Sequence, residues 1–230
     1  MEKPFLKVKL IEKKEIAQDV LDLKFEKPIG FNFLAGQFVQ FMIKTDLESV
    51  LHSYSIASEP SEEYLEFCVK LVPNGKGAQF FSKLNIGEEA FLRGPEGRFV
   101  CLETHSATKF FVATGAGIAP IMGMIKQDLK NQISKEVSLL FGVRHKEDII
   151  WQERLEELQN LFNHFSFNIT LSKPDKDWTG NSGRVTSHIA SLLKPEAEYY
   201  LCGSLEMVKD MRVILSEKGV DIKKIHFEIF

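Results

Sequence analysis

Apolar and polar residues alternate one by one in parts of the first hundred residues. The alternation is clearest in residues 21–26, Leu-Asp-Leu-Lys-Phe-Glu, and in residues 65–71, Leu-Glu-Phe-Cys-Val-Lys-Leu. A period of two is the pattern of half-buried strands. Glycine and proline interrupt these runs at short intervals, as at Gly30, Gly36, Pro60 and Gly94-Pro95. We therefore predict an antiparallel barrel or sandwich here, with one short helix at about 78–84.

The pattern changes after the polar residues 103–108. Runs that are apolar on both faces, at 110–113 and 137–141, are each followed by a helical period, at about 119–130 and 153–161. Strand-like runs at 165–171, 199–201 and 225–230 and a helical period at 207–218 continue the alternation. Buried strands that alternate with helices predict a doubly wound parallel sheet. We expect a β domain in residues 1–104 and an α/β domain in residues 105–230.

Composition and charge narrow the class of protein. The chain has 230 residues, of which 44% are hydrophobic and 27% charged, with a net charge of -3, as in ordinary globular proteins with a real core. The lack of any basic block argues against nucleic acid as a partner. The charged start Met1-Glu2-Lys3-Pro4 and the lack of an apolar run of about 18 residues predict neither a signal peptide nor a membrane span. We therefore expect a cytoplasmic location.

Three cysteines, Cys68, Cys101 and Cys202, lie far apart in the chain. Their odd number and the lack of a Cys-x-x-Cys pair argue against a disulfide framework, a structural zinc site and a cysteine-ligated iron–sulfur cluster, so we expect no metal. If the protein moves electrons, another group carries them.

A glycine turn follows the first buried strand of the second half, where residues 114–120 read Thr-Gly-Ala-Gly-Ile-Ala-Pro. Glycines at such a turn let the backbone approach a diphosphate, and the N–H groups at the helix start face the anion. A tight connection between strand and helix explains the turn equally well, because the full Gly-x-Gly-x-x-Gly fingerprint is missing. Cys202-Gly203 ends a later strand and would border the same crevice. Alone, Cys202 is more simply a small buried hydrophobe.

The stretch His52-Ser53-Tyr54-Ser55 lies between two apolar, strand-like runs, and taken alone it is a polar corner of a sheet. Together with the motifs above it resembles the ferredoxin–NAD(P)H reductase superfamily of flavoenzymes. Six motifs of that family occur here in its order: His52-Ser53-Tyr54-Ser55, Gly75-Lys76-Gly77, Gly94-Pro95-Glu96-Gly97, Thr114 to Pro120, Cys202-Gly203 and Glu228-Ile229-Phe230. The resemblance implies a six-stranded antiparallel flavin-binding β-barrel followed by a doubly wound, parallel-sheet NAD(P)-binding domain.

The resemblance also implies how the barrel holds FAD. Tyr54 would lie against the isoalloxazine ring, and Ser55 would donate a hydrogen bond near flavin N5, the atom that receives hydride. Other implied flavin contacts are the main chain of the two following segments, with charge added by Lys70 or Lys76: Val69, Lys70 and Leu71, then Gly75, Lys76, Gly77 and Ala78. For each lysine, a solvated surface position is the competing interpretation.

For the nicotinamide side, the implied cofactor contacts are Thr114, Gly115, Gly117, Ile118, Pro120 and Gly203. Cys202 would flank the nicotinamide through its shape and polarisability, while Glu228 would orient a side chain or relay a proton. We therefore predict Ser55, Cys202 and Glu228 as the catalytic residues. Phe230 is predicted to cover the flavin until nicotinamide displaces it.

Two residues depart from the family's pattern. His52 stands where the family has an arginine that binds the flavin diphosphate, and Ala78 or Phe80 stands where it has a hydroxyl residue. Both losses weaken the hold on the diphosphate, so FMN or a loosely held flavin is an alternative to bound FAD. Because the unperturbed pKa of an imidazole is near 6.5, flavin affinity is predicted to fall as the pH rises from about 6 to 8.

The choice between NADH and NADPH depends on what meets the ribose 2′ position. The candidates follow two strands, and their charge would suit a phosphate: Arg144, His145, Lys146, Ser172 and Lys173. They are equally compatible with solvated loop ends.

Three functions follow from the resemblance. The first is an NAD(P)H-dependent flavoprotein oxidoreductase that passes electrons through FAD to a small ferredoxin- or flavodoxin-type carrier. The second is an NAD(P)H:flavin reductase that releases reduced free flavin, which the missing arginine and hydroxyl favour. The third is an electron-transfer subunit of a larger complex.

Overall fold

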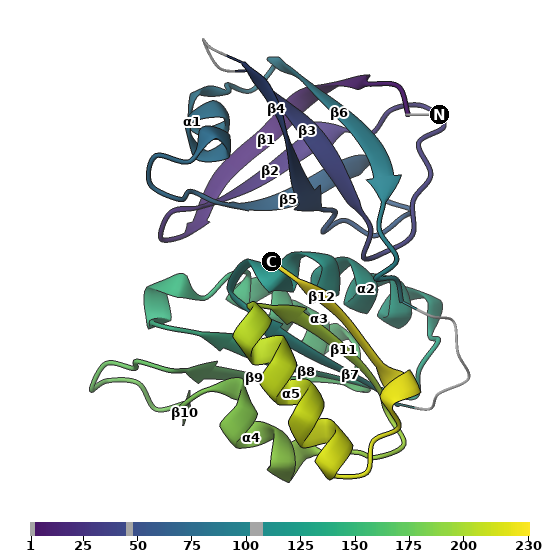
Figure 1. Cartoon of the computed structure of the whole chain (residues 1–230), viewed down its shortest axis with the longest axis vertical. Helices are drawn as coiled ribbons and strands as arrows, with labels where there is room; N and C mark the ends of the chain where they lie inside the picture. Colours follow the sequence, from purple (N-terminus) through teal and green to yellow (C-terminus); the bar gives the residue numbers. More distant parts are fainter. Residues whose placement is uncertain (1–2, 45–47, 102–107) are drawn as a thin grey trace.

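The computed structural model describes residues 3–44, 48–101 and 108–230, and it places two layers one above the other (Figure 1). The upper layer is an antiparallel barrel and the lower one is a parallel sheet with helices on both faces. The end of the chain lies at the junction of the two layers. The predicted domain boundary between residues 104 and 105 falls outside the described residues.

The barrel is one six-stranded sheet in the order β4-β3-β6-β1-β2-β5, and each described pairing of neighbours is antiparallel. Alternate side chains of the strands point inward and form a core that includes Phe25, Phe41 and Phe67. This confirms the predicted architecture. The strands are β1 (Leu6–Ala17), β2 (Val20–Glu26), β3 (Phe38–Lys44), β4 (Ser49–Ser55), β5 (Tyr64–Lys70) and β6 (Glu89–Glu96), with helix α1 (Lys76–Lys83) after β5.

The second layer is a parallel sheet in the order β10-β9-β8-β7-β11-β12, which confirms the predicted doubly wound fold. Its strands are β7 (Thr108–Thr114), β8 (Glu136–Val143), β9 (Phe165–Leu171), β10 (Asn181–Ser182), β11 (Glu198–Gly203) and β12 (Ile225–Ile229). Its helices are α2 (Ile118–Asn131), α3 (Gln152–Leu161), α4 (Val185–Leu192) and α5 (Leu205–Glu217).

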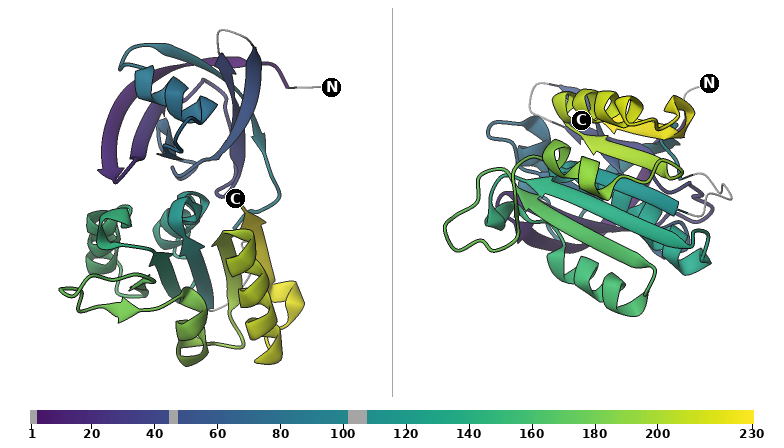
Figure 2. Two further views of the ribbon diagram at one scale, coloured as in Figure 1. Left: turned by 60° about the vertical axis from the view of Figure 1, so that its left-hand side comes forward. Right: turned by 90° about the horizontal axis from the view of Figure 1, so that it is seen from below.

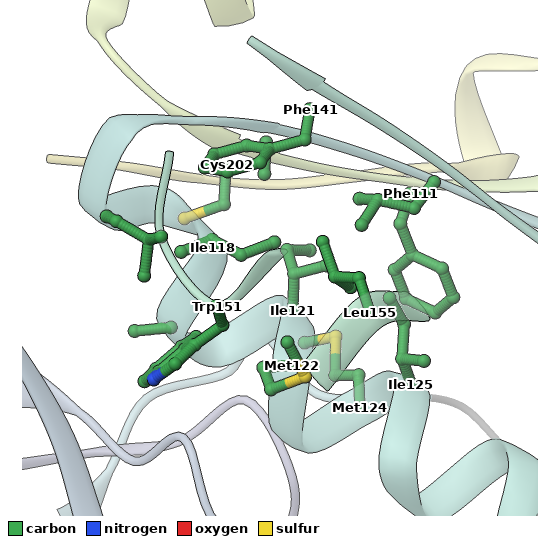
Figure 3. Packing of buried hydrophobic residues seen from close by; sticks show 14 of the residues in the cluster. Phe111, Ile118, Ile121, Met122, Met124, Ile125, Phe141, Trp151, Leu155 and Cys202 are labelled. Atoms are coloured by element: carbon green, nitrogen blue, oxygen red, sulfur yellow. The ribbon is translucent and has the colours of Figure 1, made fainter. Parts of the chain in front are cut away.

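Two separate cores cover the two faces of this sheet. Helices α2 and α3 pack on one face, and α4 and α5 pack on the other. Figure 3 shows Ile118 and Ile121 of α2 near Cys202, which comes from β11. Strands β7, β8 and β11, in the middle of the sheet, are buried on both faces, as their apolar sequences predict, whereas β9, β10 and β12 are partly exposed.

Helix α2 lies between the sheet and the barrel (Figures 1 and 2). Its Gly123 has no side chain, and a Cβ there would lie 2.9 Å from the carbonyl oxygen of Ser58 in the barrel. Gly36 plays the same part from the barrel side, since its Cβ would meet Met124 of α2. Both glycines therefore permit close contact between the layers.

The stretch His52-Ser53-Tyr54-Ser55 is the second half of strand β4. The interpretation as a polar corner is therefore wrong. Its burial alternates along the strand, so His52 and Tyr54 share one face and the exposed Ser53 lies on the other.

Within the described ranges, no helix is long and apolar enough to cross a membrane.

Candidate functional site

Strands β4 and β5 are the two edges of the barrel sheet. No ladder joins them within the described residues, although the segment after β4 reaches β5 at Glu66, whose C=O accepts from the Ala57 N–H at 2.8 Å and whose N–H donates to the Ser58 hydroxyl at 3.2 Å. The predicted flavin residues lie on these two strands and just beyond them. Ser55 ends β4, and Val69 and Lys70 end β5. The main-chain N–H of Leu71 is already engaged, because it donates to the carbonyl of Asp19 at 2.7 Å.

The start of helix α1 lies against His52 and Tyr54. A Cβ on Gly77 would come within 2.2 Å of the Tyr54 hydroxyl and 3.2 Å of His52 Nδ1, so only glycine fits here. The Tyr54 ring packs edge-on against Phe41 and Phe81, with centroids 5.9 and 5.2 Å away. Burial raises the pKa of Tyr54 to about 12, so its hydroxyl stays protonated and can donate a hydrogen bond.

Gly75 caps α1 without any side-chain hydrogen bond to the first turn. The N–H groups of that turn therefore face outward beside Lys76, Gly77 and Ala78, where an anion would be stabilised. Lys76 forms an ion pair with Glu48. Lys70 donates from Nζ to the carbonyl of Gln18 at 2.7 Å, at the rim of a different cleft described below. A role for these lysines in flavin binding stays a prediction.

The predicted catalytic residues come together where the barrel meets the sheet. Glu228 of β12 is paired in register with Cys202 of β11, and the Ser55 hydroxyl of β4 lies close enough to lower the pKa of the Glu228 carboxyl. Burial raises the pKa of Glu228 to about 7, against the lowering effect of the Ser55 hydroxyl. Burial also raises the pKa of the Cys202 thiol well above its ordinary range, with a smaller contribution from Glu228. Cys202 is thus a neutral thiol and no nucleophile.

The glycine turn touches the Cys-Gly turn. A Cβ on Gly117 would lie 2.4 Å from the carbonyl oxygen of Cys202, and one on Gly203 would lie 2.0 Å from Oγ1 of Thr114. Gly115 has a φ of +55°, and a Cβ there would meet nothing within 4 Å. The backbone at Gly115 therefore faces open space, while Gly117 and Gly203 hold the two turns together. Ile118 begins α2, and Pro120 lies in its first turn.

A cleft of about 630 Å³ opens in front of these turns. Of the predicted nicotinamide residues, it is lined by Thr114, Gly115, Arg144 and Ser172, and His145 lines it as well. Lys173 is not among the lining residues, although its N–H donates to the carbonyl of Arg144 at 2.9 Å. The glycine turn and the loops that follow β8 and β9 thus line the same cleft, as expected for the carboxyl ends of parallel strands.

One wall of this cleft comes from the barrel, which the sequence did not reveal. The tip of the β1–β2 hairpin supplies Gln18, Asp19 and Val20, and β5 supplies Lys70. The Gln18 N–H donates to the carbonyl of Glu147 at 3.1 Å, so the hairpin tip touches the loop after β8. The positive φ of Asp19 marks the tight turn but does not indicate where the tip lies.

Phe230 stands at the end of β12, where its N–H donates to the carbonyl of Gly203 at 3.0 Å. Its side chain is 57% exposed. The last residue is therefore held beside the Cys-Gly turn, and its ring is available to cover a neighbouring surface.

The residues on both sides fit dinucleotide cofactors. On the barrel side, the edge strands β4 and β5 lie beside the start of α1, which has no side-chain cap. Gly77 has no side chain that would cover His52 and Tyr54. On the sheet side, a glycine turn with a free approach at Gly115 opens into the cleft. These features suit a flavin and a nicotinamide nucleotide, respectively.

Family models match each layer. Residues 7–101 match the oxidoreductase FAD-binding domain, and residues 111–213 match the oxidoreductase NAD-binding domain.

Curated relatives match over most of the chain. The ferredoxin–NADP reductase B of Sorangium cellulosum is 31% identical over an alignment that covers 98% of this chain and 97% of the relative. The glycine betaine monooxygenase reductase subunit of Pseudomonas aeruginosa is 28% identical over 89% of this chain, which spans only 58% of that relative.

Solved structures show the same fold. A ferredoxin NADP+ reductase from Neisseria gonorrhoeae with bound FAD and NADP superposes with a TM-score of 0.89 at 23% identity, over 98% of both chains. The chain therefore belongs to the ferredoxin–NAD(P)H reductase superfamily and is an NAD(P)H-dependent flavoprotein oxidoreductase with an FAD-binding barrel and an NAD-binding α/β domain.

Proposed function

We propose that this protein passes electrons from NAD(P)H through FAD to a small carrier protein of the ferredoxin or flavodoxin type. The observation that carries the proposal is the meeting of Ser55, Cys202 and Glu228 at the junction of the two layers, between the flavin side and the nicotinamide side. The name and full-length match of the Sorangium cellulosum relative support ferredoxin as the class of acceptor.

FAD supplies the hydride-accepting chemistry when it is bound. The chain's own residues bind and orient. Ser55 presents a hydroxyl at the end of β4 and favours the ionised form of Glu228. Cys202 fills the space beside Glu228 with a neutral, polarisable thiol, and the carboxyl of Glu228 can hold or release a proton near neutral pH. Phe230, held at Gly203, is proposed to cover the flavin until the nicotinamide arrives.

Nucleotide selection is proposed to lie with the cleft residues after β8 and β9. Arg144 and His145 line this part of the cleft together with Ser172. Arg184 also lines it, but its charge is already balanced by an ion pair with Glu206 at 2.8 Å. Arg144 is therefore our candidate for contact with a 2′-phosphate, and titration with NADH and NADPH tests it.

The second candidate is an NAD(P)H:flavin reductase that releases reduced flavin. The favouring observation lies at the diphosphate end of the flavin seat, where His52 faces Gly77, Ala78 offers no hydroxyl and Lys76 is paired with Glu48. The third candidate is a subunit role in a larger complex. One relative, the glycine betaine monooxygenase reductase subunit, is named as such a subunit.

The absorbance spectrum of the purified protein after gel filtration separates these functions. Bound FAD and NAD(P)H-dependent reduction of a ferredoxin or flavodoxin are expected for our proposal. A colourless protein that turns over added flavin would support the second function instead. Turnover only in the presence of a partner oxygenase would support the third. A cytoplasmic location stays a prediction that fractionation of the source cells would test.

A further inference from the structure

Two acidic side chains are buried where the barrel meets helices α2 and α3. Asp22 of β2 is 3% exposed and Glu66 of β5 is fully buried. Asp22 is opposite Cys68 in the β2–β5 ladder, and Glu66 is two residues from Cys68. The three side chains therefore share the face of the sheet that points to the second layer. We call Asp22 and Glu66 the seam acids.

Residues of the second layer clasp both seam acids. Arg154 of α3 donates from Nη1 to Glu66 Oε2 at 3.0 Å and from Nη2 to Asp22 Oδ2 at 3.3 Å. The indole of Trp151 donates from Nε1 to the same Asp22 oxygen at 3.1 Å. Lys126 of α2 lies 3.4 Å from Glu66 Oε2. One carboxylate oxygen of each acid is therefore hydrogen-bonded to residues of the α/β layer.

The other oxygen of each acid is buried without a hydrogen bond. Among the residues that the structure describes, neither Asp22 Oδ1 nor Glu66 Oε1 has a hydrogen-bond partner. The Lys24 ammonium stays 4.0 Å from Glu66 Oε1, and it also pairs with Glu12 at 3.2 Å. A buried, unpaired carboxylate oxygen is costly, so these two atoms call for an explanation.

The surrounding charges do not remove this cost. Burial and the neighbouring Glu66 raise the pKa of Asp22 to about 6, against the lowering effects of Trp151, Arg154 and Lys24. The thiol of Cys68 and the phenol of Tyr64 stay protonated, because burial raises the pKa of both. The charged groups that face the seam acids are Lys24 of β2, Glu12 of β1, Glu62 before β5, Lys126 of α2 and Arg154 of α3.

The seam acids lie directly behind the two walls of the nucleotide cleft. Val20 and Lys70 line the barrel wall, two residues from Asp22 and Cys68, respectively. Ile150 lines the opposite wall, immediately before Trp151. The seam acids and their clasp are therefore only one or two positions along the chain from residues of both walls.

We infer that the buried pair of Asp22 and Glu66 holds one proton, on Asp22, and that this proton sets how firmly the two walls of the nucleotide cleft are held together. With the proton present, the buried pair carries a single negative charge opposite the Arg154 guanidinium, which contacts both acids. Without it, two carboxylates repel each other behind the cleft. The seam acids and Arg154 are thus positioning residues, and none is proposed to touch the reacting atoms.

The direction of the pH effect follows from the raised pKa of Asp22. The folded protein holds the proton more tightly than the unfolded chain, whose aspartate has its ordinary pKa near 3.9. The stabilising contribution of this proton is therefore fully present below about pH 4, and it is lost as the pH rises through about 6, the pKa of Asp22 in the folded protein. At neutral pH the clasp depends on Arg154, Trp151 and Lys126.

The indole N–H of Trp151 is a direct reporter. The chain has two tryptophans, and Trp178 donates its indole N–H to the carbonyl of Asn181 at 2.9 Å, away from the seam acids. In ¹⁵N-labelled full-length protein loaded with FAD, Trp178→Phe identifies the signals. The Trp151 signal is expected to shift in a single step with a midpoint near pH 6. In Asp22→Asn, whose amide imitates the protonated acid without titrating, the step is expected to vanish.

A second measurement follows the cleft wall itself. The Gln18 N–H donates to the carbonyl of Glu147 between the barrel and the α/β layer. Its hydrogen exchange therefore reports the opening of the hairpin tip. After division by the intrinsic exchange rate, protection is expected to be about 5-fold lower at pH 7.5 than at pH 5.5 in the natural chain. Asp22→Asn and Glu66→Gln are each expected to remove this pH dependence.

Lys130→Met is the matched control, because Lys130 also crosses between the layers, to Glu59 at 2.7 Å, but is exposed at 56% of its side chain. It is expected to keep both the Trp151 step and the Gln18 pH dependence. A Trp151 signal that stays flat between pH 5 and 7.5, or a step that persists in both Asp22→Asn and Glu66→Gln, would overturn the inference. Neither readout depends on the electron acceptor, so this result is separate from the proposed function.

Discussion

The two dinucleotide sites of this protein are built by different means. The proposed nicotinamide site is built around backbone turns, with Gly115 open to the cleft and Gly117 pressed against the carbonyl of Cys202. The proposed flavin seat adds side chains, chiefly His52 and Tyr54 on strand β4, to the main chain at the start of α1. Backbone sites need only that glycines stay in place, whereas a side-chain site changes with each substitution. It is therefore the flavin seat that departs from the family's pattern.

The substitution expected to have the largest effect on the proposed nicotinamide site is Gly117→Ala. The added Cβ would meet the carbonyl of Cys202 at 2.4 Å, so the turn must move. We expect a cost of about 2 to 3 kcal/mol, which weakens NAD(P)H binding roughly 30- to 150-fold in a fluorescence titration. Flavin content is expected to be unchanged.

Gly115→Ala is the control, because its Cβ meets nothing within 4 Å and only the φ of +55° is disfavoured. We expect about 1 kcal/mol, or roughly a 5-fold loss. Equal losses in both variants would show that contact with Cys202 is not what constrains the turn.

Glu228 joins the two sites, and its charge changes near neutral pH because burial raises its pKa to about 7. Loss of hydride leaves a positive nicotinamide, so the ionised carboxylate favours the reaction and the rate of flavin reduction should rise as the pH passes through 7. In stopped-flow measurements at pH 8, Glu228→Gln is expected to be slower by about 2 kcal/mol, or roughly 30-fold, with a flat pH profile.

Ser55→Ala sharpens the same experiment. The Ser55 hydroxyl lowers the pKa of Glu228, so its removal should move the midpoint of the rate profile to higher pH. A midpoint that moves to lower pH, or a Glu228→Gln profile that keeps its step, would assign the titration to another group.

His52→Arg tests the side-chain site. A permanent charge beside the start of α1 should bind the flavin diphosphate about 10-fold more tightly, for about 1.4 kcal/mol, and should abolish the predicted fall in affinity between pH 6 and 8. His52→Gln is the neutral counterpart and should be weak and independent of pH. Affinity measured by equilibrium dialysis of FAD decides the matter, and a pH-independent natural chain would contradict the role of His52.

Ala78→Ser is expected to have the smallest effect. It returns a hydroxyl to the first turn of α1, where one neutral hydrogen bond adds about 0.5 to 1 kcal/mol, or roughly 2- to 5-fold in FAD affinity. Ser53→Ala is a suitable comparison, because Ser53 is exposed on the opposite face of β4 from His52. An Ala78→Ser protein that binds FAD no better than the natural chain would place the diphosphate elsewhere.

Sequence patterns predicted several of the strands. The runs at 21–26 and 65–71 correspond to β2 and β5 and the run at 165–171 is β9, but β2 and β5 are buried almost throughout, because Asp22, Glu66 and Cys68 are covered as well. The patterns did not predict β1, whose second half carries the charged run Glu-Lys-Lys-Glu. They also did not predict that His52 to Ser55 belong to strand β4, because the polar side chains of this edge strand resemble those of a loop.

The site divides in the same way. Motifs identified the glycine turn, the Cys-Gly turn and Ser55, which are local in the sequence. The hairpin wall at Gln18 and the seam acids depend on residues more than a hundred positions apart, as between Asp22 and Trp151. No local pattern reports such a contact, so only the packing of the two layers reveals it.

The β1–β2 hairpin has a consequence for the modularity of this enzyme. Because Gln18, Asp19 and Val20 form a wall of the cleft, the α/β half severed from the barrel would present a nucleotide site with one side missing. Chimaeras that exchange barrels between relatives would exchange this wall too. Nucleotide preference would then travel partly with the donor of the flavin domain.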